Sequence, residues 1–183
     1  LKEKINLANL TEFTIEANPN DISLDFVLLL QKYHVNRISL GIQSFEENKQ
    51  TILGRNHTKE DCISALQILQ DQNFHNVNVD LIYGIEEDAF AVLESDILLA
   101  QSLGVKHFSV YSLILEEKTL LYHYYMQDKF HPMEDDAVAD IYQSLQKVME
   151  KTGFLQYEIS NFSLPGYQSK HNLIYWNNDE YIG

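Results

Sequence analysis

Cysteine and basic residues are scarce in this sequence of 183 residues. The only cysteine, Cys62, excludes an internal disulfide and is typical of a reducing compartment. Thirteen lysines and arginines stand against 27 aspartates and glutamates, which gives a net charge of -14. Such a surface repels phosphate backbones, so we expect no nucleic acid as a partner. No apolar run approaches the roughly 18 residues of a membrane span, and no signal-peptide pattern begins the chain, so we expect a cytoplasmic protein without a transmembrane segment.

Metal and dinucleotide motifs are also lacking. The seven histidines show no HExxH or other metal-ligand spacing, and no GxGxxG follows a predicted strand. Cys62 lies on the apolar face of a predicted helix, where a small buried side chain is the simpler interpretation and a nucleophile is the alternative. We therefore expect no metal ligands within this chain.

Hydrophobic residues make up 45% of the sequence, which is enough for a sizeable core. Strand-like and helix-like patterns alternate along the chain. The expected strands are 12–17, 37–42, 77–82, 106–113 and 155–160. The expected helices are 24–34, 46–53, a segment that begins after Thr58, 89–103 and 134–152, followed by an irregular tail over 161–183. This order favours an α/β fold with a parallel sheet and outer helices, namely a (β/α) TIM-like barrel or part of one.

Polar residues lie in or directly after several of these strands. They are Glu16, Gln43, Ser44, Asp80, His107, Ser109, Tyr111, Glu158, Ser160 and Asn161. The carboxyl ends of parallel barrel strands face one site, so we expect these side chains to converge. Simpler interpretations remain open: Glu16 as a helix cap, and Asp80 as the buried partner of Arg37 or Arg55 in an ion pair.

The polar tail contains an unusual cluster. His171, Asn172, Tyr175 and Trp176, the only tryptophan, lie within six residues. These residues would either dock the tail onto the barrel or contact a ligand, and the sequence favours neither interpretation.

Six segments in sequence order carry a family resemblance. They are EANP (16–19), RISLGIQSF (37–45), LGRNH (53–57), NVDLIYG (78–84), HFSVY (107–111) and YEISNF (157–162). Together they resemble the radical S-adenosylmethionine (SAM) proteins related to oxygen-independent coproporphyrinogen III oxidase. The HN-x-x-YW pattern at 171–176 is similar to the oxidase-like branch of that family, which is understood as heme chaperones.

The resemblance implies roles for particular residues. Those matching SAM-binding positions are Glu16, Gln43, Arg55 and Asp80, with Ile114 as a backbone contact. Carboxylates accept hydrogen bonds from a ribose diol or an amine, and the forked guanidinium of Arg55 suits the SAM carboxylate. His171, Tyr175 and Trp176 become candidates for contact with heme or substrate. The implied cofactors of the full-length protein are SAM and a [4Fe-4S] cluster, and the implied partners are heme or a porphyrin and heme-acceptor proteins.

The departures from the family pattern are equally informative. The cluster motif CxxxCxxC is absent, although three thiolates are needed to hold such a cluster. We therefore expect residues 1–183 to be the central part of a radical SAM barrel, without its N-terminal cluster-binding strands and C-terminal domain. Such a fragment would be inactive alone and would bind no cofactor. No catalytic residue is assigned. The alternatives are the oxidase itself, which decarboxylates propionates, and a clusterless barrel that serves as an interaction module.

Overall fold

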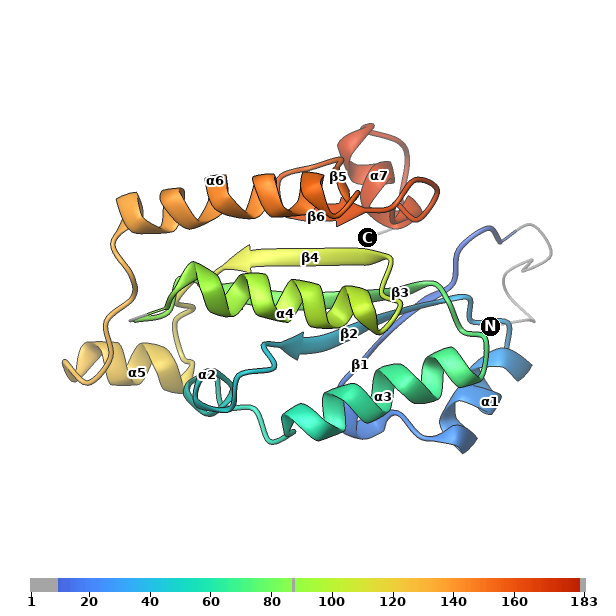
Figure 1. Cartoon of the computed structure of the whole chain (residues 1–183), viewed down its shortest axis with the longest axis horizontal. Coiled ribbons are helices and arrows are strands. Elements are labelled where there is room, and N and C mark those ends of the chain that lie inside the picture. Colours follow the sequence, from blue (N-terminus) through green and yellow to red (C-terminus); the bar gives the residue numbers. More distant parts are fainter. Residues whose placement is uncertain (1–9, 87, 182–183) are drawn as a thin grey trace.

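A computed structural model describes residues 10–86 and 88–181 of the chain (Figure 1). Strands and helices alternate as the sequence predicts. The elements are β1 (Thr14–Ala17), the 3-10 helix η2 (Pro19–Asp21), α1 (Leu24–Lys32), β2 (Arg37–Gln43), α2 (Glu47–Ile52), α3 (Lys59–Asp71), β3 (Val77–Tyr83), α4 (Phe90–Ser102), β4 (His107–Ser112), α5 (Leu120–Met126), α6 (Asp135–Lys151), β5 (Leu155–Gln156), β6 (Asn161–Ser163) and α7 (Lys170–Trp176).

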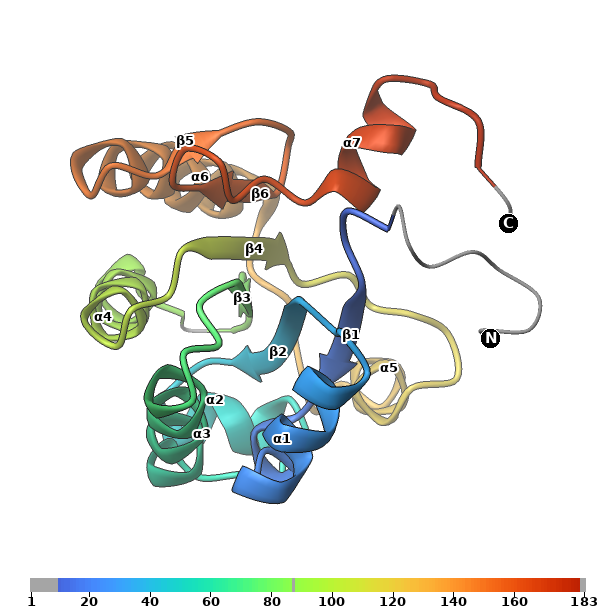
Figure 2. The same ribbon diagram turned by 90° about the vertical axis from the view of Figure 1, so that its right-hand side faces the viewer.

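The strands form one sheet in the order β1-β2-β3-β4-β6-β5. Strands β1 to β4 pair in parallel, which confirms the α/β class. Figure 2 shows the helices α1, α3, α4 and α6 around the outside of the curved sheet. Within the described residues the sheet is open, with β1 at one edge and β5 at the other. The architecture is therefore a partial barrel with outer helices, as expected.

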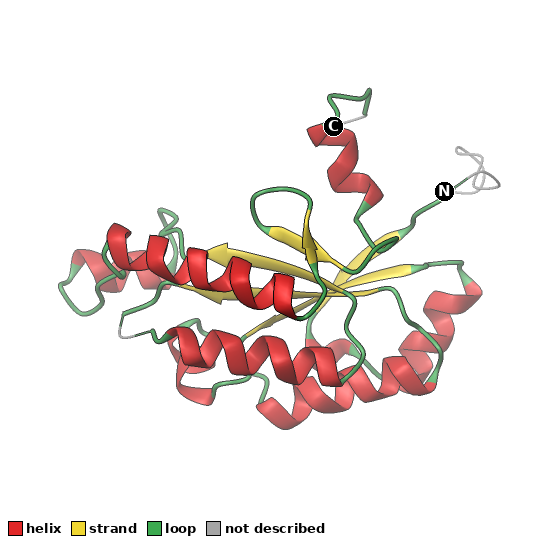
Figure 3. Cartoon of the chain, turned by 45° about the horizontal axis from the view of Figure 1, so that its top comes forward, coloured by secondary structure: helices red, strands yellow, loops and turns green. Residues whose placement is uncertain are grey.

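The last part of the sheet differs from the expectation of a fifth strand over 155–160. The chain instead turns back after Gln156, and β6 runs antiparallel to both β4 and β5. The turn has its own hydrogen bonds: the Glu158 carboxylate accepts from the backbone N–H of Ser160 and from the Asn161 side chain. These local bonds take the place of the strand that the pattern predicts. Figure 3 shows the strands in yellow and the loops between them in green.

The hydrophobic core lies between the sheet and the outer helices. Ile38, Leu40, Val79, Leu81 and Phe108 face this layer and are fully buried. The opposite face of the same strands is polar. The alternation of side chains thus separates a core face from a second face, here called the inner face.

Helix α3 shows how local sequence fixes an element. Thr58 and Asp61 form the capping box that the sequence predicts. The apolar stripe of α3 that begins at Cys62 is buried in the core. Helices α5 and α7 lie in segments for which the sequence predicted no helix; Thr119 and Ser169 cap them. No helix in the described part of the chain is long and apolar enough to cross a membrane.

Candidate functional site

The inner face of the sheet carries rows of polar residues. Parallel register places Glu16 beside Ser39, Ser39 beside Asn78, and Asn78 beside His107. The next row contains Gly41, Asp80, Ser109 and Asn161. Barrel interiors are usually filled by branched apolar side chains. A polar lining on four neighbouring strands therefore indicates a binding surface and not a core.

Two adjoining cavities, of about 300 Å³ and 270 Å³, open on the inner face and share Glu16, Ser39 and Asp80. The α7-side cavity is also lined by Thr14, Arg37, Asn78, Tyr111, His171 and Asn172. The Arg55-side cavity is also lined by Asn18, Gly41, Gln43 and Arg55. The Arg55-side cavity thus brings together four of the five residues that the resemblance implies for SAM.

Asp80 lies in the wall between the two cavities. The Asn78 side chain donates to its carboxylate at 2.7 Å and the Ser39 hydroxyl at 3.1 Å. Burial nevertheless raises the pKa of Asp80 above its ordinary value, and these hydrogen bonds and the charge of Arg37 oppose the rise only in part. The carboxylate is therefore held in a fixed direction while its charge is poorly compensated.

The simpler interpretations of Asp80 and Glu16 are both wrong. In the described part of the chain, no ion pair joins Asp80 to Arg37 or Arg55. Glu16 does not cap the helix α1, because the Ser23 hydroxyl accepts the capping hydrogen bond there. Both carboxylates thus remain available to a ligand in the cavities.

Gln43 occupies a strained position at the end of β2. Its φ angle is 68°, and the pairing of β2 with β3 shifts by one residue between Gly41 and Gln43. This bulge turns the Gln43 side chain toward the cavity and back over Gly41, where an added Cβ would lie 3.2 Å from Gln43 Nε2. Left-handed backbone in a non-glycine residue costs energy and is concentrated at functional sites.

Three buried side chains hold the segment around this bulge. Asp96 of α4 accepts from the hydroxyl of Ser44 at 2.6 Å and from the backbone N–H of Phe45 at 3.1 Å. The Gln50 amide donates to the carbonyl of Ser44, and His57 Nε2 lies 3.0 Å from the carbonyl oxygen of residue 42. The position of Gln43 is therefore set by the core side of the sheet, which the sequence pattern does not reveal.

His107 of β4 connects Asn78 of β3 to Tyr157, which follows β5. Its Nδ1 lies 2.5 Å from Asn78 Oδ1 and its Nε2 lies 2.7 Å from the Tyr157 hydroxyl. An amide oxygen only accepts, so Nδ1 carries the proton and Tyr157 donates to Nε2. Burial, aided by the charge of Arg37, lowers the pKa of His107 to about 3. The imidazole is thus a neutral connector between the inner face and Tyr157.

The tail helix α7 docks beside the sheet through Glu12. The Glu12 carboxylate accepts from the backbone N–H groups of Lys170 at 2.9 Å and His171 at 3.1 Å. His171 lines the α7-side cavity, whereas Tyr175 and Trp176 are 46% and 54% exposed. The tail therefore brings His171 to the cavity and leaves the rings of Tyr175 and Trp176 about half exposed.

Ile114 lies apart from the other predicted SAM residues. It follows β4, is 77% exposed and lines neither inner-face cavity. The sequence reasoning also missed Ser39, Asn78 and Arg37 as lining residues. Their position in β2 and β3, an even number of residues from Gly41 or Asp80, would have placed them on the same face.

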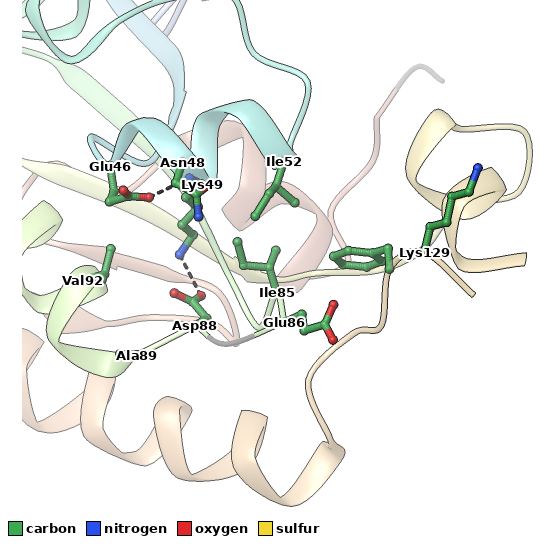
Figure 4. A pocket seen from close by; sticks show the side chains of 11 residues that line it. Glu46, Asn48, Lys49, Ile52, Ile85, Glu86, Asp88, Ala89, Val92 and Lys129 are labelled. Carbon is green, nitrogen blue, oxygen red and sulfur yellow. Dashed lines mark hydrogen bonds and ion pairs between the residues drawn. The ribbon is translucent and has the colours of Figure 1, made fainter. Parts of the chain in front are cut away.

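A larger cavity, of about 560 Å³, lies outside the sheet between α2 and the start of α4 (Figure 4). Its buried charges, on the side chains of Lys49 and Asp88, pair with each other at 2.8 Å, and each side chain is 3% exposed. Asp88 also accepts from the backbone N–H of Gly84. These charges stabilise the loop after β3, so the cavity does not present them to a ligand.

The described residues do not fit an iron–sulfur cluster. No group of three or more His, Cys, Asp or Glu side chains among residues 10–86 and 88–181 is arranged to hold a metal ion. Burial raises the pKa of Cys62 to about 12, so its thiol stays protonated. The interpretation of Cys62 as a small buried side chain is confirmed.

An open, mostly parallel sheet with outer helices and a polar inner face defines a barrel-type α/β fold with a candidate ligand site on that face. The chain belongs to the radical SAM superfamily, whose family description matches residues 1–96. The family resemblance seen in the sequence motifs is thereby confirmed.

Curated relatives extend the match along the whole chain. Heme chaperone HemW of Bacillus subtilis is 39% identical over 176 residues, covering 96% of this chain and 46% of the relative. Heme chaperone HemW of Escherichia coli is 34% identical over 183 residues, covering 100% and 47%. The chain spans about half the length of the curated relatives it matches.

Solved structures agree on the fold. Coproporphyrinogen III oxidase (HemN) from Escherichia coli, a radical SAM enzyme, superimposes with a TM-score of 0.72 at 22% identity. The match covers 91% of this chain and 38% of that chain. Archaeal Elp3 from Methanocaldococcus infernus gives a TM-score of 0.65 at 20% identity, covering 75% and 32%. At these identities the likeness establishes the fold alone.

Proposed function

We propose that this chain is the SAM-binding central part of a longer radical SAM protein that acts as a heme chaperone. The observation that carries the proposal is the placement of Glu16, Gln43, Arg55 and Asp80 around one cavity of the inner face. The relatives named heme chaperones support the choice of branch. Strands that bind the cluster would precede this part, and a C-terminal domain would follow it.

The side chains around the Arg55-side cavity fit SAM in their chemistry. Glu16 and Asp80 would accept from the ribose hydroxyls or the amine, and Arg55 would hold the carboxylate in a two-point contact. Within the described residues the Arg55 guanidinium makes one hydrogen bond, to the Asn18 amide oxygen at 3.5 Å, so most of its donors are available. Gln43 both donates and accepts in the same cavity. When bound, SAM and a cluster held outside this chain would supply the family's radical chemistry.

Residues of the tail would contact heme. His171 would be the candidate ligand of the heme iron, because an imidazole nitrogen is a common protein ligand of heme iron and this residue lines the α7-side cavity. The exposed rings of Tyr175 and Trp176 would contact the macrocycle. Heme-acceptor proteins would receive the heme. We propose the cytoplasm as the location of the protein.

The test uses the full-length protein, purified and reconstituted anaerobically with iron and sulfide. We expect calorimetry to show SAM binding that weakens at least tenfold in Arg55→Gln, and heme titration to give a saturable Soret band. A matched control is Lys32→Gln, which removes the same charge from the exposed surface of α1. If the protein bound neither SAM nor heme, the proposal would be overturned and a clusterless interaction module would be favoured.

The oxidase alternative is separated by activity. A coproporphyrinogen III oxidase would release carbon dioxide from propionate side chains under reducing conditions with SAM. We expect no decarboxylation of coproporphyrinogen III together with stoichiometric heme binding. Decarboxylation without heme binding would assign the protein to the oxidases instead.

A further inference from the structure

Arg37 is a buried cation that has no counter-ion among residues 10–86 and 88–181. It begins β2 and is 4% exposed, and its Nε has no hydrogen-bond partner. No carboxylate of the described residues lies within ion-pair distance of its guanidinium. Lys49, the other buried cation in the described part of the chain, pairs with Asp88 at 2.8 Å. Because an unpaired buried charge is costly, the position of Arg37 calls for an anion that the described residues do not supply.

The surroundings of Arg37 define where that anion would lie. Arg37 lines the α7-side cavity, on the same face of β2 as Ser39 and beside Thr14. The nearby imidazole of His107 is neutral, so it does not compensate the positive charge of Arg37. The charge of Arg37 lowers the pKa of Asp80 slightly, but Asp80 accepts hydrogen bonds from Ser39 and Asn78 and forms no ion pair with Arg37.

His171 and Asn172 also line this cavity. A molecule held by the tail helix would therefore share one cavity with the guanidinium. The volume of about 300 Å³ suits a short acyl arm and is too small for a whole macrocycle.

We propose that Arg37 binds a carboxylate group of the ligand held by α7, namely a propionate arm of a porphyrin, through a two-point guanidinium–carboxylate contact. This inference rests on the proposed heme binding and adds a specificity-determining residue to it. The planar guanidinium matches a carboxylate in geometry, and the contact is strong because it is removed from water. The macrocycle itself would stay beside His171, outside the narrow part of the cavity.

The test compares ferric heme with its dimethyl ester, in which both carboxylates are masked as methyl esters. Soret titrations use the full-length protein and three variants: Arg37→Met, Arg37→Lys and the surface control Lys32→Gln. We expect wild type and Lys32→Gln to bind the free acid about ten to a hundred times more tightly than the ester. Arg37→Met should bind both forms with the affinity that wild type has for the ester. Arg37→Lys keeps the positive charge but loses the two-point guanidinium contact, so it should retain a smaller preference for the free acid.

Thermal unfolding of the ligand-free proteins separates this role from a structural one. If Arg37 lacks a protein partner, Arg37→Met removes an unpaired buried charge and should melt at or above the wild-type temperature. A melting temperature several degrees lower, with an unchanged preference for the acid, would mean that Arg37 pairs with a carboxylate elsewhere in the longer protein. Equal binding of acid and ester by wild type would overturn the propionate contact while heme binding stands. Failure to bind either form would overturn both.

Discussion

Glu12 and His171 lie 159 residues apart, and the Glu12 carboxylate accepts a hydrogen bond from the His171 backbone N–H at 3.1 Å. The same carboxylate accepts from the N–H of Lys170. A residue before the first strand thus fixes the first turn of the tail helix. Since α7 has only seven residues, its stability depends on such contacts and not on helix propensity.

We expect Glu12→Ala to loosen α7 selectively. The first-turn N–H groups lose their acceptor, which should cost about 1 kcal/mol, as for loss of a helix cap. Hydrogen exchange should become faster at residues 170–172 and stay unchanged in β3. Glu150→Ala, on the exposed side of α6, is the control and should leave both regions protected. Uniform loss of protection across the sheet would show that Glu12 supports the whole fold instead.

Asp80→Asn should separate ligand binding from stability. Burial raises the folded-state pKa of Asp80, so folding favours the protonated form. The associated stability is present below the unfolded pKa of about 3.9 and is lost as pH rises through the folded value. At pH 7 wild type must bury an ionised carboxylate, whereas the variant buries a neutral amide. The variant should therefore be as stable as wild type or slightly more stable in urea titrations.

The same substitution should weaken SAM binding to the reconstituted full-length protein. We expect a loss of about 1–3 kcal/mol by calorimetry, the scale of a hydrogen bond to a charged group. Unchanged affinity combined with a sharp loss of stability would identify Asp80 as a structural residue.

His107 should make the fold sensitive to acid. Its pKa falls from about 6.5 in an unfolded chain to about 3 in the fold, so the stability it gives is present above pH 6.5 and is lost as pH falls toward 3. The contribution should fall by up to about 1.4 kcal/mol per pH unit in this window. His107→Gln should remove that part of the slope, measured by urea unfolding at several pH values. His75→Gln, at an exposed site, should keep it; equal slopes in all three proteins would contradict the buried neutral imidazole.

Cys62 should be unreactive in the folded chain. With its pKa raised to about 12 and its side chain buried, the thiolate is scarcely populated at pH 7. We expect alkylation by iodoacetamide only in denaturant, and no [4Fe-4S] absorption or EPR signal after anaerobic reconstitution of this chain alone. Alkylation of the native chain would contradict the first expectation, and a stoichiometric cluster on the chain would contradict the second.

Local patterns in the sequence were sufficient for most of the fold. The capping box at Thr58, the stripe of α3 and the alternation in β2 and β3 depend on neighbours within a few residues, so they can be read directly. The turn at Glu158 could not be read in this way. Its sequence alternates like a strand, and side-chain bonds to Ser160 and Asn161 decide the outcome.

The candidate site was only partly predictable for a similar reason. The polar strand residues point to the site by themselves, as Glu16 and Asp80 do. The conformation of Gln43 results from a register shift between two strands, and the sequence indicates Arg37 only as a possible ion-pair partner of Asp80. Both features depend on contacts between segments far apart in the sequence.

The order of the strands has a consequence for synthesis. From β1 to β4, each strand pairs with the one made just before it, so the growing chain can add to its sheet without waiting for later segments. Pairing between successive strands keeps these contacts closer in sequence than pairing across the sheet would. The hairpin of β5 and β6 comes last, and the tail then closes on Glu12 near the beginning. The segment that carries His171 is thus positioned only when the rest of the described sheet is already in place.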